Sequence, residues 1–170
     1  ELPGEARGIL HKPVDWSVTT LPTMAIGYGV SVTGLQLVSA YCAVANDGLL
    51  MAPQIIKTLI HADGTVQDKS PTGVRKVISE RTAALLRQVF TSVVDYGAGR
   101  AAAVPGYNVA GKTGTAWKAR EGAPGYTKDY RSSFVGMFPA ENPEIVALIM
   151  IDEPTEGGFY GGSVAAPAFR

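Results

Sequence analysis

One segment constrains this chain more than any other: residues 109–116, which read Val-Ala-Gly-Lys-Thr-Gly-Thr-Ala. Glycine lets a ligand approach the main chain, and alternate residues of a strand share a face, so Thr113 and Thr115 point the same way. Two hydroxyl groups and the Lys112 ammonium suit an anion, most simply a carboxylate. The same composition also fits a glycine-rich strand or turn that carries a solvated lysine.

A second pattern covers part of this segment. Gly106–Thr113 spells G-x-x-x-x-G-K-[ST], the phosphate-binding loop of nucleotide hydrolases, and Val146–Asp152 is an apolar run ending in an acid that could hold magnesium. Such a loop needs an apolar strand before its first glycine and a helix after its Lys-Thr pair. Pro105 directly precedes Gly106, so no apolar strand runs into the first glycine. Gly122 ends any helix after Thr113 within about two turns. We therefore expect residues 107–117 to form one extended strand, and a P-loop NTPase is the remote alternative.

Composition narrows the class of protein further. The chain has 170 residues, 15 Lys and Arg against 15 Asp and Glu, and 46% apolar residues, which suits one globular domain or a large piece of one and argues against a nucleic-acid binder. No apolar run approaches the roughly 18 residues that cross a bilayer. Cys42 is the only cysteine, and His11 and His61 are far apart in sequence, so we expect no disulfide, no metal site and no cofactor.

Turn, cap and periodicity signals predict helices and strands along the rest of the chain. Thr33 and Gln36 form a capping box, and Ser79 is a second N-cap. The last strands can pair as an antiparallel meander with the two helices covering one face. The expected elements are an irregular stretch over 1–32, a helix over about 34–46, a hairpin of 54–61 with 65–67, a helix over about 80–95, a polar loop over 120–128, and strands over 107–117, 132–139 and 144–152.

The position of each strand in the sheet follows from its side chains. Residues 145–151 are apolar without alternation, so we expect that strand to be central and buried on both faces. The glycine-bearing strand has groups left over for a ligand, so we expect it at an edge, beside a cleft.

Lys112-Thr113-Gly114, followed by Thr115-Ala116, resembles the third motif of the penicillin-binding proteins and serine β-lactamases. The likeness runs in order over nearly the whole chain. Other segments look like the C-terminal half of class B, division-type peptidoglycan transpeptidases of the penicillin-binding protein 3 kind, namely Tyr28–Leu37, Ala45–Gly48, Tyr130–Gly136 and Gly161–Pro167.

The resemblance implies a fold and a function. The fold would be the α/β (α+β) transpeptidase or serine β-lactamase-like fold, a five-stranded antiparallel sheet with helices on both sides, of which residues 1–170 are the C-terminal portion. The function would be cross-linking of D-Ala-D-Ala stem peptides through a serine acyl-enzyme that β-lactams also acylate, in septal cell-wall synthesis. The resemblance places such a protein at the bacterial inner membrane, facing the periplasm, with its anchor outside this chain and other division proteins as partners.

The resemblance also assigns roles to individual residues. Lys112 would support the active-site hydrogen-bond network, Thr113 and Thr115 would bind the terminal carboxylate, and the Thr115 backbone N–H would be an oxyanion-hole donor. The aromatic positions would line the cleft, or else only pack against one another. The implied substrate- and β-lactam-binding positions are Lys112, Thr113, Gly114, Thr115, Tyr130, Phe159 and Tyr160.

This sequence departs from the family pattern in one respect. None of its serines is followed three residues later by lysine, and no Ser-x-Asn occurs. We therefore expect the nucleophile, S-x-x-K and S-x-N to lie in an N-terminal part of the same protein, and this chain to be inactive alone. A penicillin-recognising sensor, an inactive binder of cell-wall peptide and a β-lactamase are the related alternatives.

One geometric difficulty arises within the third motif. Ideal alternation places Lys112 on the face opposite Thr113 and Thr115, although the resemblance needs all three near one ligand. A twisted edge strand or the long lysine stem would reconcile the two.

Overall fold

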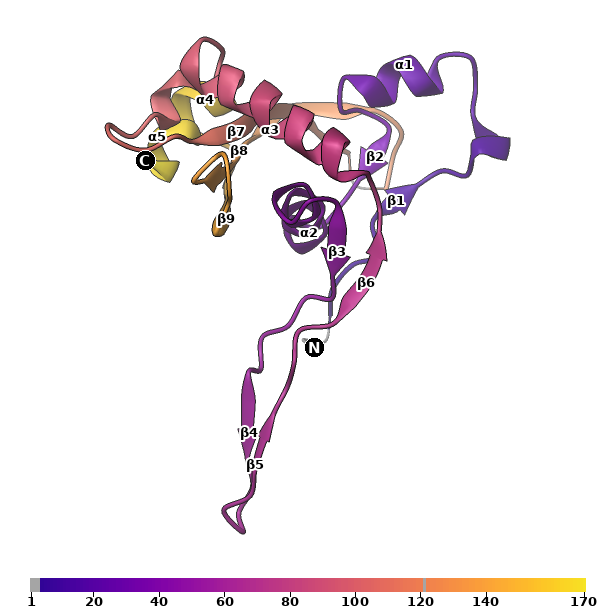
Figure 1. Ribbon diagram of the computed structural model, residues 1–170. Coiled ribbons are helices and arrows are strands. Elements are labelled where there is room, and N and C mark those ends of the chain that lie inside the picture. Colours follow the sequence, from indigo (N-terminus) through magenta and orange to yellow (C-terminus); the bar gives the residue numbers. More distant parts are fainter. Residues whose placement is uncertain (1–3, 121) are drawn as a thin grey trace.

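The computed structural model describes residues 4–120 and 122–170. Residues 1–3 of the expected irregular stretch and residue 121 of the expected loop lie outside this range. The elements, in chain order (Figure 1), are β1 (Ile9–Leu10), the 3-10 helix η1 (Pro13–Asp15), α1 (Thr20–Ala25), β2 (Val30–Ser31), α2 (Gly34–Ala45), β3 (Leu49–Met51), β4 (Thr58–Ile60), β5 (Val66–Asp68), β6 (Gly73–Lys76), α3 (Glu80–Asp95), the 3-10 helix η2 (Arg100–Ala102), β7 (Ala110–Ala119), β8 (Tyr126–Phe138), β9 (Ile145–Asp152), α4 (Gly161–Val164) and α5 (Ala166–Phe169).

An antiparallel sheet of order β7-β8-β9 forms the centre of the structure. The predicted meander is confirmed, and β7 lies at an edge of this sheet as expected. Among the described strands β9 pairs with β8 alone, so the predicted central place of residues 145–151 is not found within this chain. Helices on both faces, rather than strands on both sides, account for its apolar sequence: Val146 contacts one core and Ile149 the other.

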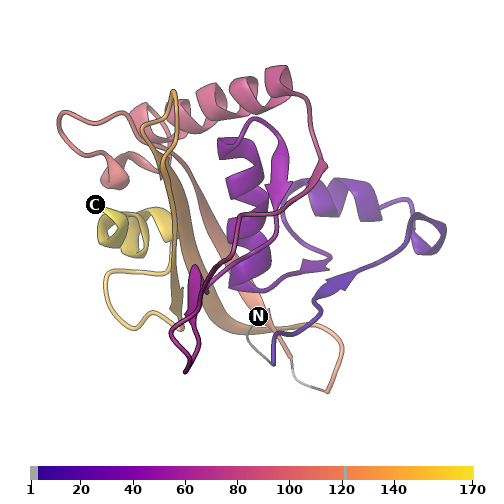
Figure 2. The same cartoon turned by 60° about the horizontal axis from the view of Figure 1, so that its bottom comes forward.

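Helices cover both faces of the sheet (Figure 2), where the sequence predicted cover on one. On one face, α2 and Phe90 of α3 pack against Ala110 and Met137. On the other face, η2, α5 and Val94 of α3 surround Phe134, which is fully buried. The helix α3 thus contacts both cores. This two-faced arrangement agrees with the fold class that the resemblance implies.

The two predicted long helices begin where their capping residues indicate. The Thr33 hydroxyl accepts from the Gln36 amide at 3.1 Å, and the Gln36 side chain accepts from the Thr33 amide at 3.0 Å. The Ser79 hydroxyl accepts from the Thr82 amide at 3.1 Å, which starts α3. These caps confirm both predictions.

The region from residue 49 to residue 76 forms a long two-stranded arm (Figure 1). The strand β3 pairs with β6 next to the body of the molecule, and β4 pairs with β5 further out. The predicted hairpin is therefore confirmed. The stretch over 1–32 is less irregular than predicted, since it contains α1 and the short β1-β2 pair. Among residues 4–120 and 122–170, no helix combines the length and apolar character needed to cross a membrane.

Candidate functional site

Backbone hydrogen bonding decides which groups of β7 face the open edge of the sheet. The Glu153 amide donates to the Tyr130 carbonyl at 2.9 Å, so Tyr130 directs its backbone toward β9. Backbone direction alternates along an antiparallel strand, so the odd-numbered residues of β8 face β7, and Gly114 lies opposite one of them. Thr113 and Thr115, one residue to either side of Gly114, therefore direct their N–H and C=O groups away from β8. These groups face the edge that no described strand covers.

The Lys112 side chain reaches this open edge from the opposite face of the sheet. Lys112 is exposed, whereas Thr113 and Thr115 are half-buried on the other face. The Lys112 Nζ donates to the Thr113 carbonyl oxygen at 2.8 Å. The long lysine stem thus brings the ammonium around the strand to a backbone group at the edge, and the conflict with ideal alternation disappears.

The glycines of β7 are explained by contacts inside the sheet. A Cβ at Gly111 would lie 2.4 Å from the Cζ of Phe134, and a Cβ at Gly114 would lie 2.5 Å from the Oγ of Ser133. The sequence argument assigned these glycines to ligand access. The structure supplies a second reason for them, which is close packing against side chains of β8.

A C-terminal segment, residues 159–161, is tied to the sheet beside Thr115. The Gly161 amide donates to the Thr115 Oγ1 at 2.9 Å. The hydroxyl of Ser132, which is fully buried, donates to the Phe159 carbonyl. Sequence reasoning assigned no role to Ser132 or Gly161. Neither could be paired with its partner from spacing, because the contacts join residues 46 and 27 positions apart.

An aromatic cluster lies next to this segment. The rings of Tyr130 and Phe159 stack at 4.1 Å between centroids and 15° between planes, and Tyr160 lies 4.5 Å from Phe159. Trp117 adds a fourth ring, 6.1 Å from Tyr130. The structure thus brings Tyr130, Phe159 and Tyr160 together, and their place along a cleft stays a prediction. Sequence reasoning missed Trp117, although strict alternation from Thr115 would have placed it on the same face of β7.

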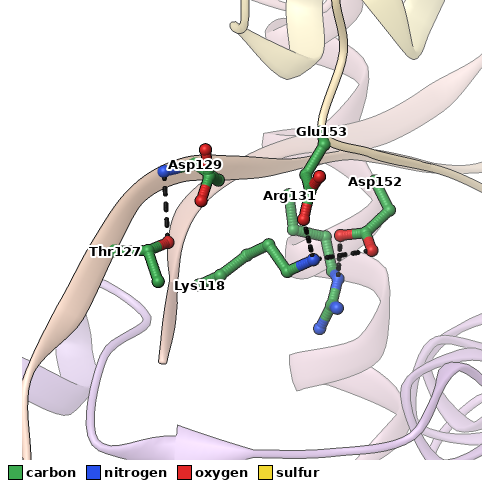
Figure 3. Close-up of polar contacts among 6 residues, drawn as sticks. All are labelled: Lys118, Thr127, Asp129, Arg131, Asp152 and Glu153. Carbon is green, nitrogen blue, oxygen red and sulfur yellow. Dashed lines mark hydrogen bonds and ion pairs between the residues drawn. The ribbon is translucent and has the colours of Figure 1, made fainter. Parts of the chain in front are cut away.

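An ion-pair network links side chains of β7 and β8 to the C-terminal end of β9 (Figure 3). The Lys118 Nζ lies 2.9 Å from Asp152 and 2.5 Å from Glu153, and the Arg131 Nε lies 3.1 Å from Asp152. Hydrogen bonds to Glu153 and Asp152 raise the pKa of Lys118. Hydrogen bonds from Lys118 and then Arg131 lower the pKa of Asp152. These contacts add side-chain links between β7, β8 and the end of β9, whose register is set by backbone pairing.

The structure excludes the P-loop alternative. Lys112 and Thr113 lie inside β7, which continues to Ala119, so no helix begins directly after them. Asp152, the acid that would hold magnesium, is occupied by Lys118 and Arg131. Within the described part of the chain, no group of three His, Cys, Asp or Glu side chains could hold a metal ion. The P-loop NTPase interpretation of Gly106–Thr113 is therefore wrong.

The expected cleft beside β7 stays a prediction. The structure forms an apolar pocket of about 560 Å³, but this pocket is lined by α2, β3, β6 and α3. It includes Leu35, Val44, Leu50 and Leu86 and none of the residues of β7. The open edge of β7 and this pocket are separate features of the surface.

Comparison with known proteins places this arrangement in a family. A sequence profile described as the penicillin binding protein transpeptidase domain matches residues 1–170. The chain belongs to this family. It is 44% identical over 179 residues to penicillin-binding protein PbpB of Mycolicibacterium smegmatis, covering 99% of this chain and 28% of the relative.

Solved structures of this transpeptidase family share the fold. The apo transpeptidase domain of Burkholderia pseudomallei penicillin-binding protein 3 matches with a TM-score of 0.82 and 45% identity, over 99% of this chain and 48% of that one. Penicillin-binding protein 3 of Mycobacterium tuberculosis, complexed with ampicillin, matches with a TM-score of 0.87 and 37% identity, over 98% of this chain and 39% of that one. This transpeptidase chain thus spans less than a third of the Mycolicibacterium smegmatis relative and less than half of these two solved chains.

Proposed function

We propose that residues 1–170 are the C-terminal portion of the transpeptidase domain of a peptidoglycan D,D-transpeptidase, and that they supply its substrate-binding strand. One observation carries the proposal. In a chain of this family, β7 presents at one open edge the backbone groups of Thr113 and Thr115 and the ammonium of Lys112. Hydroxyl, amide and ammonium donors at an open strand edge suit the carboxylate end of an extended peptide, which can add to such an edge by main-chain hydrogen bonds.

The proposed chemistry is acyl transfer. A serine in the remainder of the domain attacks the penultimate D-Ala carbonyl, terminal D-Ala leaves, and an amine of a neighbouring stem peptide resolves the acyl-enzyme. The Thr115 N–H, which points to the open edge, is the proposed oxyanion donor, a group whose removal typically costs about 10²- to 10³-fold in rate. Lys112 and the hydroxyls of Thr113 and Thr115 hold the terminal carboxylate of the peptide or of a β-lactam, with Gly114 between them. Tyr130, Phe159 and Tyr160 are the proposed aromatic lining.

The surface area supports the view that more of the domain packs against this chain. The described chain exposes 11632 Å². A compact monomer of 17.8 kDa would expose about 8,000 Å². The extra surface includes large apolar side chains, among them Val32 and Leu35, each close to half exposed. A nucleophile-bearing portion that covers this surface accounts for both the area and the absence of S-x-x-K in the chain.

The cellular role follows from the division-type segments of the sequence. We propose that the protein acts in septal cell-wall synthesis, at the inner membrane with its catalytic domain facing the periplasm, together with other division proteins. A fluorescent fusion of the full-length protein should then gather at the septum of dividing cells. An even distribution along the cell wall would contradict this role and would leave the transpeptidase proposal intact.

The enzymatic proposal is tested by acylation and turnover of the full-length protein. A fluorescent penicillin should label it covalently, and a D-Ala-D-Ala stem peptide should release D-Ala when an acceptor amine is present. Absence of labelling would overturn the proposal. Labelling without release of D-Ala would point to a penicillin-recognising sensor, and rapid hydrolysis of the penicillin would point to a β-lactamase.

A further inference from the structure

The surroundings of Thr115 include a contact for which the proposed function has no role. Gly161, the buried first residue of α4, directs its backbone N–H at the Thr115 Oγ1 from 2.9 Å. On the same segment, the Phe159 carbonyl accepts from the buried hydroxyl of Ser132 in β8. The two hydrogen bonds fix residues 159–161 against neighbouring strands of the sheet. The amide that meets Thr115 is therefore held in one position.

Sterics make this contact specific to glycine. A Cβ at residue 161 would lie 2.4 Å from the carbonyl oxygens of Gly114 and Ser133, both of them backbone atoms. The adjacent Gly162 is equally restricted, since its Cβ would lie 2.2 Å from the Ala98 carbonyl oxygen. Backbone atoms within a sheet cannot move aside as a flexible side chain can. Any side chain at residue 161 must push α4, and the amide with it, away from Thr115.

The hydrogen bond also decides what the Thr115 hydroxyl has left to offer. A hydroxyl carries one hydrogen to donate and two lone pairs to accept. The Gly161 amide uses a lone pair, so the hydroxyl hydrogen must point elsewhere. Among the described residues the structure records no acceptor for that hydrogen. An amide that donates to a hydroxyl oxygen also polarises the hydroxyl. This strengthens the hydrogen bond that the hydroxyl itself can donate.

We propose that Gly161 is a positioning residue for substrate binding. Its amide holds the Thr115 hydroxyl with the hydrogen directed to the open edge of β7, ready to donate to the carboxylate of a stem peptide or β-lactam. This inference rests on the proposed function, because it takes the Thr115 hydroxyl as a carboxylate ligand. Thr113, its neighbour on the same face, has no such contact recorded for its hydroxyl within the described chain, so the two threonines differ in preorganisation.

The test compares two ligands on the full-length protein. One is a β-lactam with its free carboxylate, and the other is the methyl ester of the same compound. Gly161→Ala should lower the second-order acylation rate for the free acid about tenfold, the scale of one hydrogen bond to a charged group, and should change the ester rate less than about twofold. An equal loss with both ligands would show that Gly161 only supports the fold, and would overturn the inference.

A double-mutant cycle then asks whether Gly161 acts through Thr115. In a Thr115→Val background, Gly161→Ala should have almost no further effect on acylation by the free acid, because the hydroxyl it orients is gone. In a Thr115→Ser background, which keeps the hydroxyl, the tenfold effect should return. Additive losses in the Thr115→Val background would contradict the inference.

Two further variants guard against misfolding. Ser132→Ala removes the tether to Phe159 without adding volume, and should give a smaller loss with the same preference for the free acid. Ser163→Ala, at the exposed third residue of α4, is the matched control and should match the wild type. A Ser132→Ala loss that is equal for acid and ester would overturn the inference. Absence of acylation of the wild type by either compound would contradict the proposed function itself, and this inference with it.

Discussion

Thr113 and Thr115 show how identical side chains on one face of a strand acquire different environments. Both point to the face that α4 partly covers, and both have backbone groups at the open edge of β7. The Thr113 carbonyl accepts from Lys112 at 2.8 Å, whereas the Thr115 hydroxyl accepts from Gly161 at 2.9 Å. The Thr113 carbonyl thus positions the Lys112 ammonium, and the Gly161 amide of α4 positions the Thr115 hydroxyl.

These environments lead to a prediction for the two hydroxyls. Thr113→Val and Thr115→Val should each slow acylation of the full-length protein by a carboxylate-bearing β-lactam about tenfold, since each removes one hydrogen bond to a charged group. The measurement is stopped-flow acylation with a fluorescent penicillin. Thr72→Val, at an exposed threonine of the two-stranded arm, is the control and should behave as wild type. If Thr113→Val and Thr115→Val were both acylated at the wild-type rate, neither hydroxyl would take part in binding the β-lactam.

Gly48 and Gly64 provide a matched test of close packing. Both have left-handed φ, of +88° and +85°, which costs a side chain about 1–2 kcal/mol. A Cβ at Gly48 would lie 2.1 Å from the Ile78 carbonyl oxygen, whereas a Cβ at Gly64 would have no atom within 4 Å. Gly64→Ala should therefore lower the free energy of unfolding by about that strain alone, and Gly48→Ala by clearly more. Urea unfolding of the two variants in the complete domain measures the difference, and equal losses would contradict the packing argument.

At the scale of elements, local signals identified the long helices and the hairpin. The caps at Thr33 and Ser79 and the turn at Gly64 act within a few residues, so the sequence displays them directly. The six-residue α1 was missed because its N-cap, Thr19, makes no side-chain capping bond and its apolar pattern is short. The place of β9 in the sheet does not follow from its apolar sequence, because helices on both faces also account for such a sequence and strand order depends on contacts that no local pattern contains.

The candidate site likewise combines features that one local segment predicts with contacts between residues distant in sequence. The hydroxyls of β7 follow from alternation along one strand, and so does the position of Trp117. The contact from Gly161 and the buried Ser132 depend on residues that are distant in sequence and meet only after folding. Contacts of this kind leave no spacing pattern, and a single sequence does not show them.

The ion-pair network at the ends of the strands predicts a dependence of stability on pH. Lys118 and Arg131 lower the pKa of Asp152 in the folded protein below its unfolded value of about 3.9. Asp152 therefore stabilises the fold above that value, and this contribution is lost as the pH falls through the lower, folded pKa. In urea unfolding between about pH 6 and pH 2.5, Asp152→Asn should show a shallower loss of stability on acidification than the wild type.

Asp129 provides the control for this prediction. It lies on the same strand as Arg131 (Figure 3), and within the described residues its carboxylate has no recorded ion pair. Asp129→Asn should keep the acid dependence of the wild type. If Asp152→Asn and the wild type lose stability in parallel, the network does not couple proton binding to folding.

For the whole molecule, the balance between buried and exposed apolar surface sets what the chain can do alone. Its buried core consists mainly of small residues around Phe134 and Met137. The apolar pocket beside α2 and the outer edge of β9 have no described segment over them. A chain with this much uncovered apolar surface is expected to bind hydrophobic dyes and to self-associate.

We therefore predict that residues 1–170, produced alone, will bind a hydrophobic fluorescent dye strongly, will associate at rising concentration in analytical ultracentrifugation, and will not react with a fluorescent penicillin. The complete domain should bind the dye weakly, stay monomeric and react. Leu35→Gln, which places a polar group at a half-exposed residue lining the pocket, should lower dye binding by the isolated chain, whereas Leu21→Gln, at an exposed leucine of α1 outside the pocket, should lower it less. A monomeric isolated chain without dye binding would show that its apolar surface needs no cover, and acylation of that chain would show that it carries a nucleophile of its own.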